Sequence, residues 1–310
     1  RGELVLRGAA SAALHPLRSL RTAARVVPNL DQTPVLRSLP GVQTLSRSAR
    51  TLGRRGAAPG EGPNLNAPRT RFNVPLAGPR SVAFGTLPFA AVRRVRQDTG
   101  VTINDVVMAL CAGALRRRLT AWGELPGQPL VAYVPVSVRA ADGEQFGNAI
   151  SSIIAPIPTH LADARERVAF ASEAMRAAKR RHQTIPTTLL SDTAALIPAP
   201  LFSIATRGVF AAITSGRVPA PVNLIISNVM GSPTELRSDG CRVLAQYPQS
   251  LVFDGIALNI TVVSYVDGVD VGITADGRAM PDAWELLDDM RAELALMAGT
   301  TRSTLASTRG

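Results

Sequence analysis

The chain has 310 residues, and 46% of them are hydrophobic, which is enough to form the core of one large domain or two smaller ones. The net charge of +11 is uneven, because residues 1–70 hold eleven arginines against three acidic residues while the remainder is nearly neutral. With only 4% aromatic residues the chain offers few side chains on which bases could stack, and we expect no nucleic-acid partner.

The first 52 residues form a basic, amphipathic segment. Leu17, Leu20 and Ala24 recur at helical spacing, and arginines follow a second stripe. Such a helix can lie on an anionic membrane surface. It can equally be one of a pair of ordinary helices that pack on a partner domain, and both interpretations stay open. Residues 53–70 are rich in glycine and proline and are interpreted as a linker.

Helices and strands follow in the body of the chain, residues 71–298, where apolar spacing predicts helices and β-branched runs predict strands. The expected helices cover residues 89–97, 103–119, 163–181, 198–213 and 281–297. The expected strands cover residues 129–139, 148–157, 222–229, 242–247, 257–266 and 269–275. Asp267-Gly268 is expected to form a two-residue hairpin turn. Residues 299–310 are expected to be a frayed tail.

This order of elements predicts an α/β fold in which helices cover a mixed sheet. No GxGxxG or GxxxxGK[ST] sequence occurs in a suitable place, so neither a dinucleotide site nor a P-loop is expected. The three histidines lie far apart in the sequence, and no metal site is predicted. Cys111 and Cys241 are interpreted as small buried residues.

No part of the chain approaches the ~18 consecutive apolar residues that a membrane span needs. We therefore expect a cytoplasmic protein that touches a membrane surface without crossing it.

Six segments, taken in order, resemble one family. They are PRTRFNVPL (68–76), TINDVVMALCAGALRRRL (102–119), VPVSVR (134–139), GNAISS (147–152), LIISNVMGSP (224–233) and FDGIALNITVVSY (253–265). No single segment is specific. Their order and spacing are similar to the C-terminal part of the bacterial wax ester synthase/diacylglycerol acyltransferase family, over residues 67–298.

The resemblance implies a chloramphenicol-acetyltransferase-like sandwich and acyl-CoA-dependent O-acyl transfer. Family members have two such halves with a tunnel between them, which acyl-CoA enters from one side and diacylglycerol or a fatty alcohol from the other. The first half carries the motif HHxxxDG, whose second histidine is the general base on the acceptor hydroxyl. Acyl-CoA is then a co-substrate, and no cofactor is implied.

The sequence departs from the family at that motif. No two histidines are adjacent, and Asp254-Gly255 has no histidine before it. His160 and His182 are interpreted as solvated side chains. We therefore expect the chain to be the second half of such an enzyme, inactive alone and without a catalytic residue of its own. Met230 is a second departure, because the family usually has proline there, in an SNVPGP-like motif.

Asn104 and Asp105 match the ND pair of the family. Thr102 and Asp105 also have the spacing of a capping box, and an acidic residue in the first turn suits the positive end of a helix. Asp105 is therefore interpreted as a helix cap. For Asn104 two interpretations remain: structural support, or the positioning of CoA or of the catalytic loop from the other half.

Four further residues are candidates for substrate or active-site support. Ser227 and Asn228 end a strand, where they could donate to a thioester carbonyl or oxyanion, or satisfy backbone groups at a turn. Arg139 follows another strand and could pair with a phosphate or a buried carboxylate. Asn148 lies within a strand, where asparagine is disfavoured, and is expected, like Asn259, to satisfy a neighbouring loop.

Three functions compete. The first is the C-terminal half of an acyltransferase that makes triacylglycerol or wax esters together with an N-terminal half. The second is a non-catalytic module that binds lipid, either an anionic membrane or a lipid droplet, through residues 1–52. The third is a condensation or polyketide-associated acyltransferase of the same superfamily, and the ND and SNV segments argue against it.

Overall fold

The computed structural model describes residues 67–137, 150–184, 211, 213–217 and 219–307. Residues 65–182 and 211–310 form one compact unit, which holds the described strands and nearly the whole of each described helix. The basic segment 1–52, most of the linker and the candidates Arg139 and Asn148 lie outside the described residues, as does most of the expected helix 198–213.

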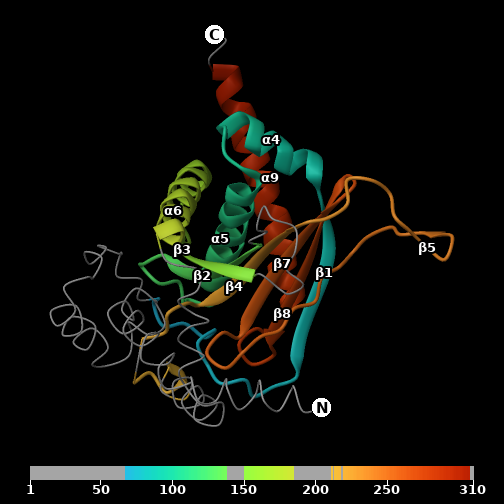
Figure 1. Ribbon diagram of the computed structural model, residues 1–310. Helices are drawn as coiled ribbons and strands as arrows, with labels where there is room; N and C mark the ends of the chain where they lie inside the picture. Colours follow the sequence, from blue (N-terminus) through green and yellow to red (C-terminus); the bar gives the residue numbers. More distant parts are fainter. Residues whose placement is uncertain (1–66, 138–149, 185–210, 212, 218, 308–310) are drawn as a thin grey trace, which may run out of the picture. The chain divides into compact units, whose positions relative to one another are not determined.

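A six-stranded mixed sheet forms the centre of this unit (Figure 1). In spatial order its strands are β1 (Arg80–Pro88), β8 (Gly268–Asp276), β7 (Leu258–Tyr265), β4 (Leu224–Met230), β2 (Leu130–Ser137) and β3 (Ile150–Ile157). Strand β4 runs parallel to both of its neighbours, and the other pairs are antiparallel. The predicted mixed sheet is confirmed.

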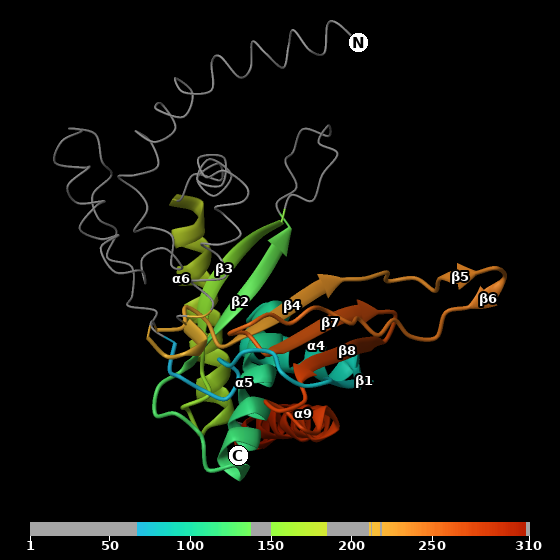
Figure 2. The ribbon, with the colours of Figure 1, turned by 90° about the horizontal axis from the view of Figure 1, so that it is seen from below.

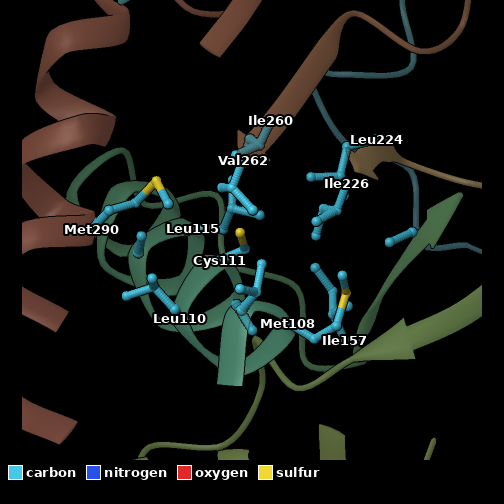
Figure 3. Packing of buried hydrophobic residues seen from close by; sticks show 14 of the residues in the cluster. Met108, Leu110, Cys111, Leu115, Ile157, Leu224, Ile226, Ile260, Val262 and Met290 are labelled. Carbon is cyan, nitrogen blue, oxygen red and sulfur yellow. The ribbon is translucent and has the colours of Figure 1, made fainter. Parts of the chain in front are cut away.

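Helices pack on one face of the sheet. They are α4 (Phe89–Thr99), α5 (Ile103–Ala121), α6 (Ala164–Thr184) and α9 (Ala283–Ser307). In Figure 3, Ile226, Ile260 and Val262 point from the sheet toward Cys111 and Leu115 of α5, and all five side chains are buried. Helix α5 is therefore the central helix of the core. Its burial raises the pKa of the Cys111 thiol to about 12.

The opposite face of the sheet carries polar side chains. Successive side chains of a strand point to opposite faces, so these residues alternate with the core residues. Asn259 and Thr261 of β7 alternate with the core residues Leu258, Ile260 and Val262. On β8, Asp270 and Thr274 lie on this polar face, where they alternate with core residues in the same way.

An extended segment, residues 243–253, crosses this polar face, and we call it the strap. The amide of Gln246 donates to Asp270 Oδ2 (2.7 Å), and Asn259 Nδ2 donates to the carbonyl of Leu251 (3.0 Å). Thr274 Oγ1 donates to Gln249 Oε1 (3.0 Å). Hydrogen bonds that involve side chains thus fix the strap against the polar face of the sheet. The expectation that Asn259 satisfies a neighbouring loop is confirmed.

Glycine is required where the strap passes closest to the sheet. A Cβ atom built on Gly272 would lie 1.5 Å from the carbonyl oxygen of Pro248, so no larger residue fits without moving the strap.

A longer loop connects β4 to the strap. It carries two short strands, β5 (Arg237–Ser238) and β6 (Cys241–Arg242), at a tip that projects away from the six-stranded sheet (Figure 2). The strand predicted at 242–247 is wrong beyond Arg242, because the chain there leaves β6 and becomes the strap. The prediction that Cys241 is buried is also wrong, since it is exposed at this tip.

Three other predictions differ from the structure. Residues 299–307, expected to lie in a frayed tail, continue helix α9 to Ser307. Strand β1 was not expected, although Val82, Phe84 and Thr86 alternate with the buried Ala83, Gly85 and Leu87. The β7–β8 turn is centred on Val266 and Asp267, one residue earlier than expected, because Tyr265 pairs with Gly268.

Within the ranges that the structure describes, no single helix has the length and apolar composition to cross a membrane. Only α4 and α5 taken together, across a bend of 107°, satisfy those two criteria.

The turn between β7 and β8 provides a test of local strain. Val266 has a φ of 49°, which a β-branched residue rarely adopts. We expect Val266→Gly to raise the free energy of unfolding by about 1 kcal/mol, because glycine adopts positive φ without that strain. Urea denaturation of the variant measures this change.

The matched control is Val269→Gly. Val269 is buried in the regular strand β8, where the same change should destabilise through loss of packing. Destabilisation by Val266→Gly as well would contradict the assignment of strain to the turn.

Candidate functional site

The N-terminus of α5 is fixed by a reciprocal capping box. Thr102 Oγ1 accepts from the amide of Asp105 (3.3 Å), and Asp105 Oδ2 accepts from the amide of Thr102 (3.0 Å). Asp105 is buried. The predicted cap is therefore confirmed, and the carboxylate of Asp105 is engaged in it.

Asn104, the other member of the ND pair, points to a different partner. Asn228 Nδ2 donates to Asn104 Oδ1 (3.4 Å), and both side chains are half-buried. The contact joins the first turn of α5 to the end of β4, across 124 residues of sequence. The structure thus brings together one residue from each of two segments that carry the family resemblance.

The remaining candidate on β4 lies elsewhere. Side chains alternate along a strand, so Ser227 points to the face opposite Asn228. It pairs in register with Thr261, which hydrogen-bonds to Ser250 of the strap (2.9 Å). Ser227 therefore belongs to the strap side of the sheet and does not join the Asn104–Asn228 pair.

The end of β4 is shaped by a close backbone approach. A Cβ atom on Gly231 would lie 2.2 Å from the carbonyl oxygen of Ser264, and the amide of Gly231 donates to Ser264 Oγ (3.3 Å). Met230, which departs from the family pattern, continues the strand, and its side chain is 91% exposed. The turn thus comes after Met230, and the substitution places an apolar side chain in solvent.

Two residues that sequence reasoning missed position these elements. Asn223 and Asn73 are buried, and Asn223 Nδ2 donates to Asn73 Oδ1 (2.8 Å). Asn73 Nδ2 in turn donates to the carbonyls of Val222 (2.8 Å) and Gly255 (3.0 Å). The available signal was an asparagine beside apolar residues in or directly before each of two motif segments, since a buried side-chain amide needs hydrogen-bond partners.

The Asp254-Gly255 pair has a structural role. Asp254 Oδ1 accepts from the amide of Leu76 (2.8 Å), and the amide of Gly255 donates to the carbonyl of Val74 (2.9 Å). Gly255 has a φ of 82°, which favours glycine. These bonds hold the segment 68–76 against the start of β7.

His160 lies far from the Asn104–Asn228 pair. Its backbone carbonyl accepts from Arg116, twelve residues further along α5 than Asn104, which is roughly 18 Å at 1.5 Å per residue. Its ring packs edge-on against Phe170. Partial burial and the nearby charge of Arg116 lower the pKa of His160, which favours the neutral imidazole. It was expected to be solvated and is instead half-buried.

The chemistry available at the Asn104–Asn228 pair is hydrogen bonding. The cap occupies the amide of Asp105, and the amide of Val106 donates to the carbonyl of Thr102. In the described part of the chain, no acceptor lies against the amides of Ile103 and Asn104, at the positive end of the helix. Such donors suit a carbonyl oxygen or a phosphate. Neither asparagine can act as a general base.

Two family models match this chain. The model of the WS/DGAT C-terminal domain matches residues 146–298, and the model of the wax ester synthase/diacylglycerol acyltransferase catalytic domain matches residues 9–107. The second match includes most of the basic segment 1–52 and the linker.

Two relatives come from Mycobacterium tuberculosis H37Rv, and both are provisionally named diacylglycerol O-acyltransferases. One is 38% identical over 77% of this chain and 47% of its own length. The other is 36% identical over 74% of this chain and 50% of its own length. The chain spans about half the length of the curated relatives it matches.

A solved structure has the same fold. It is the wax ester synthase/diacylglycerol acyltransferase from Marinobacter aquaeolei VT8, which is 31% identical with a TM-score of 0.62, over 76% of this chain and 52% of that one. The sheet and its helices therefore have the chloramphenicol-acetyltransferase-like fold. The chain belongs to the wax ester synthase/diacylglycerol acyltransferase family.

The two members of the ND pair should respond differently to substitution in an enzyme assembled with an HHxxxDG-bearing half. Asp105→Ala should lower the free energy of unfolding by roughly 1 kcal/mol, because it removes a cap. Asn104→Ala should reduce turnover and leave the unfolding midpoint within a few tenths of a kcal/mol. Urea denaturation and steady-state kinetics measure the two effects.

Asn228→Ala serves as the control for Asn104→Ala. Because the two side chains contact each other, the double variant should lose less activity than the two single losses combined. Stability changes alone at both positions, with normal turnover, would make the motif purely structural.

Proposed function

We propose that this chain forms the C-terminal part of an acyl-CoA-dependent O-acyltransferase that esterifies diacylglycerol, long-chain alcohols or both. The observation that carries the proposal is the Asn104–Asn228 contact, which places two family segments side by side at the end of β4. The helix end beside it offers hydrogen-bond donors for the thioester carbonyl or for a phosphate of CoA.

The general base in this proposal lies outside these 310 residues. The sequence holds no HHxxxDG motif, and the match covers only 50% and 47% of the length of the two relatives. A histidine of the complementary half would take the proton of the acceptor hydroxyl while the hydroxyl oxygen attacks the thioester carbon. The carbon–sulfur bond then breaks, and the CoA thiolate leaves and takes up the proton. The asparagine pair would hold the carbonyl during this step.

Exposed apolar side chains support docking of a complementary half. Seven of them come from the end of β4, the projecting loop and the strap: Val229, Met230, Leu236, Leu244, Tyr247, Leu251 and Phe253. The polar side of the strap is engaged with the sheet, so its apolar side faces outward. An apolar surface of this kind is typical of an interaction site. We propose that the HHxxxDG-bearing half covers it.

A second candidate function is supported by the charge distribution. Residues 1–70 combine eleven arginines with apolar stripes, which suits an anionic membrane or lipid-droplet surface. In this proposal the protein is cytoplasmic and binds such a surface peripherally. Flotation with anionic vesicles, with and without residues 1–52, tests it; equal flotation of both forms would contradict it.

The acyltransferase proposal is tested by complementation. The chain alone should show no acyl transfer from acyl-CoA to diacylglycerol or to hexadecanol. Mixed or co-expressed with the HHxxxDG-bearing half of a relative, it should form ester. Acyl transfer by the chain alone would overturn the split of the site between two halves.

A matched pair of variants tests the docking surface. Leu251→Asp, in the strap, should prevent assembly with the other half and abolish complementation. Leu296→Asp, at an exposed apolar position on α9, should leave both unchanged. Equal effects of the two substitutions would contradict docking on the strap.

A further inference from the structure

Strand β1 forms one edge of the six-stranded sheet. It pairs with β8 over its whole length, from Arg80 opposite Asp276 to Pro88 opposite Gly268. No strand among the described residues pairs with its other side. On that side β1 has the position of an edge strand, whose backbone groups can pair with another strand.

The edge lacks the features that usually protect such strands. Charged side chains and prolines discourage edge-to-edge pairing. In β1 the one charged residue is Arg80, at the first position, and the one proline is Pro88, at the last. The residues between them are uncharged, and Val82 and Phe84 expose 38% and 43% of their surface.

An aromatic cluster lies along this edge. The ring of Phe84 is 5.0 Å from that of Tyr247 and 5.3 Å from that of Trp284, measured between ring centroids. Tyr247 and Trp284 expose 41% and 45% of their surface. Half-exposed aromatic side chains of this kind are typical anchors of protein interfaces.

Helix α9 adds two opposite charges beside the cluster. Trp284, Asp288 and Arg291 follow one another at helical spacing on one stripe of the helix. Arg291 Nη1 donates to Asp288 Oδ1 (2.7 Å), and these side chains are 47% and 71% exposed. Arg291 lies over the middle of β1, since a Cβ atom on Gly85 would be 2.8 Å from its Nη2. Neighbouring charges of opposite sign can complement a second copy of themselves across a two-fold axis.

We propose that two copies of this chain associate through β1, antiparallel and centred on Phe84. In this register Phe84 lies opposite its counterpart, Val82 lies opposite Thr86, and the two sheets become one. The Asp288 and Arg291 side chains of one copy then face Arg291 and Asp288 of the other. The inference is independent of the acyltransferase activity.

A second copy fits this edge better than a lipid surface does. A strand satisfies the open backbone groups of β1, whereas the hydrocarbon of a membrane leaves them unpaired. The charged stripe also contains one acid for one base, so it exerts no net attraction on anionic lipid.

Disulfide cross-linking tests the register. In a Cys241→Ser background, a mixture of Val82→Cys and Thr86→Cys chains should form a disulfide-linked dimer, because directly opposite residues lie within disulfide reach. Val82→Cys chains alone should not. Their two cysteines would be separated by four residues along the strands, roughly 13 Å. No cross-link in the mixture, or equal cross-linking in the single-variant samples, would overturn the proposal.

Sedimentation velocity gives a second measurement that leaves Thr86 and Phe84 intact. The wild-type 310-residue chain should sediment as a dimer at tens of micromolar, and Val82→Lys should shift it to the monomer. Leu244→Lys, at an exposed position of the strap outside the aromatic cluster, should have no effect. A wild-type monomer, or a dimer lost with Leu244→Lys and kept with Val82→Lys, would contradict association through β1. If the chain instead floated with vesicles and lost this binding when Val82 or Phe84 was replaced, that result would also contradict association through β1.

Discussion

The side chain of Asn223 holds the centre of the sheet together. Strands β2 and β4 pair directly only where Ala132 and Tyr133 lie beside Leu224 and Ile225. Asn223 extends this short ladder, because its backbone amide donates to the carbonyl oxygen of Val131 (2.7 Å) and its side-chain Oδ1 accepts from the backbone amide of Val131 (2.8 Å). Its Nδ2 also reaches the carbonyl of Pro68 (2.6 Å) and the side chain of Asn73. The position of β4, and of Asn228 at its far end, follows from these bonds. All of them are buried or partly buried, so leaving one partner unsatisfied costs about 1–3 kcal/mol.

This constraint explains several motifs that look functional in sequence. The segment 68–76 is bound by Asn223, Asp254 and Gly255, and it joins the start of β4 to the start of β7. The asparagine and aspartate residues of these motifs serve as backbone mimics at strand ends. The Asn104–Asn228 contact differs from them, because its side chains are half-buried and lie at the first turn of α5, where the described residues place no acceptor against the amides of residues 103 and 104. In the function proposed above, this contact is where the acyl donor binds.

The sequence predicted what depends on local or periodic signals. The cap at Thr102 and Asp105 was predictable because its two hydrogen bonds span three residues. Most helices and buried strands were predictable from their apolar periodicity. Strand β1 was missed because Gly85 and its flanking prolines resemble a loop. The strap was mistaken for a strand because its apolar residues face outward while its backbone and polar side chains bind the sheet. The Asn104–Asn228 contact could not be derived, since no periodicity relates residues 124 positions apart.

The central claim is that the end of β4 and the first turn of α5 face the acyl donor. Hydrogen exchange on the complete enzyme, with and without a non-hydrolysable thioether analogue of acyl-CoA, tests it most directly. The account predicts slower exchange at the amides of residues 103–104 and 229–231, and unchanged exchange in the loop around His160. Protection confined to that loop, or no protection anywhere in this chain, would contradict it.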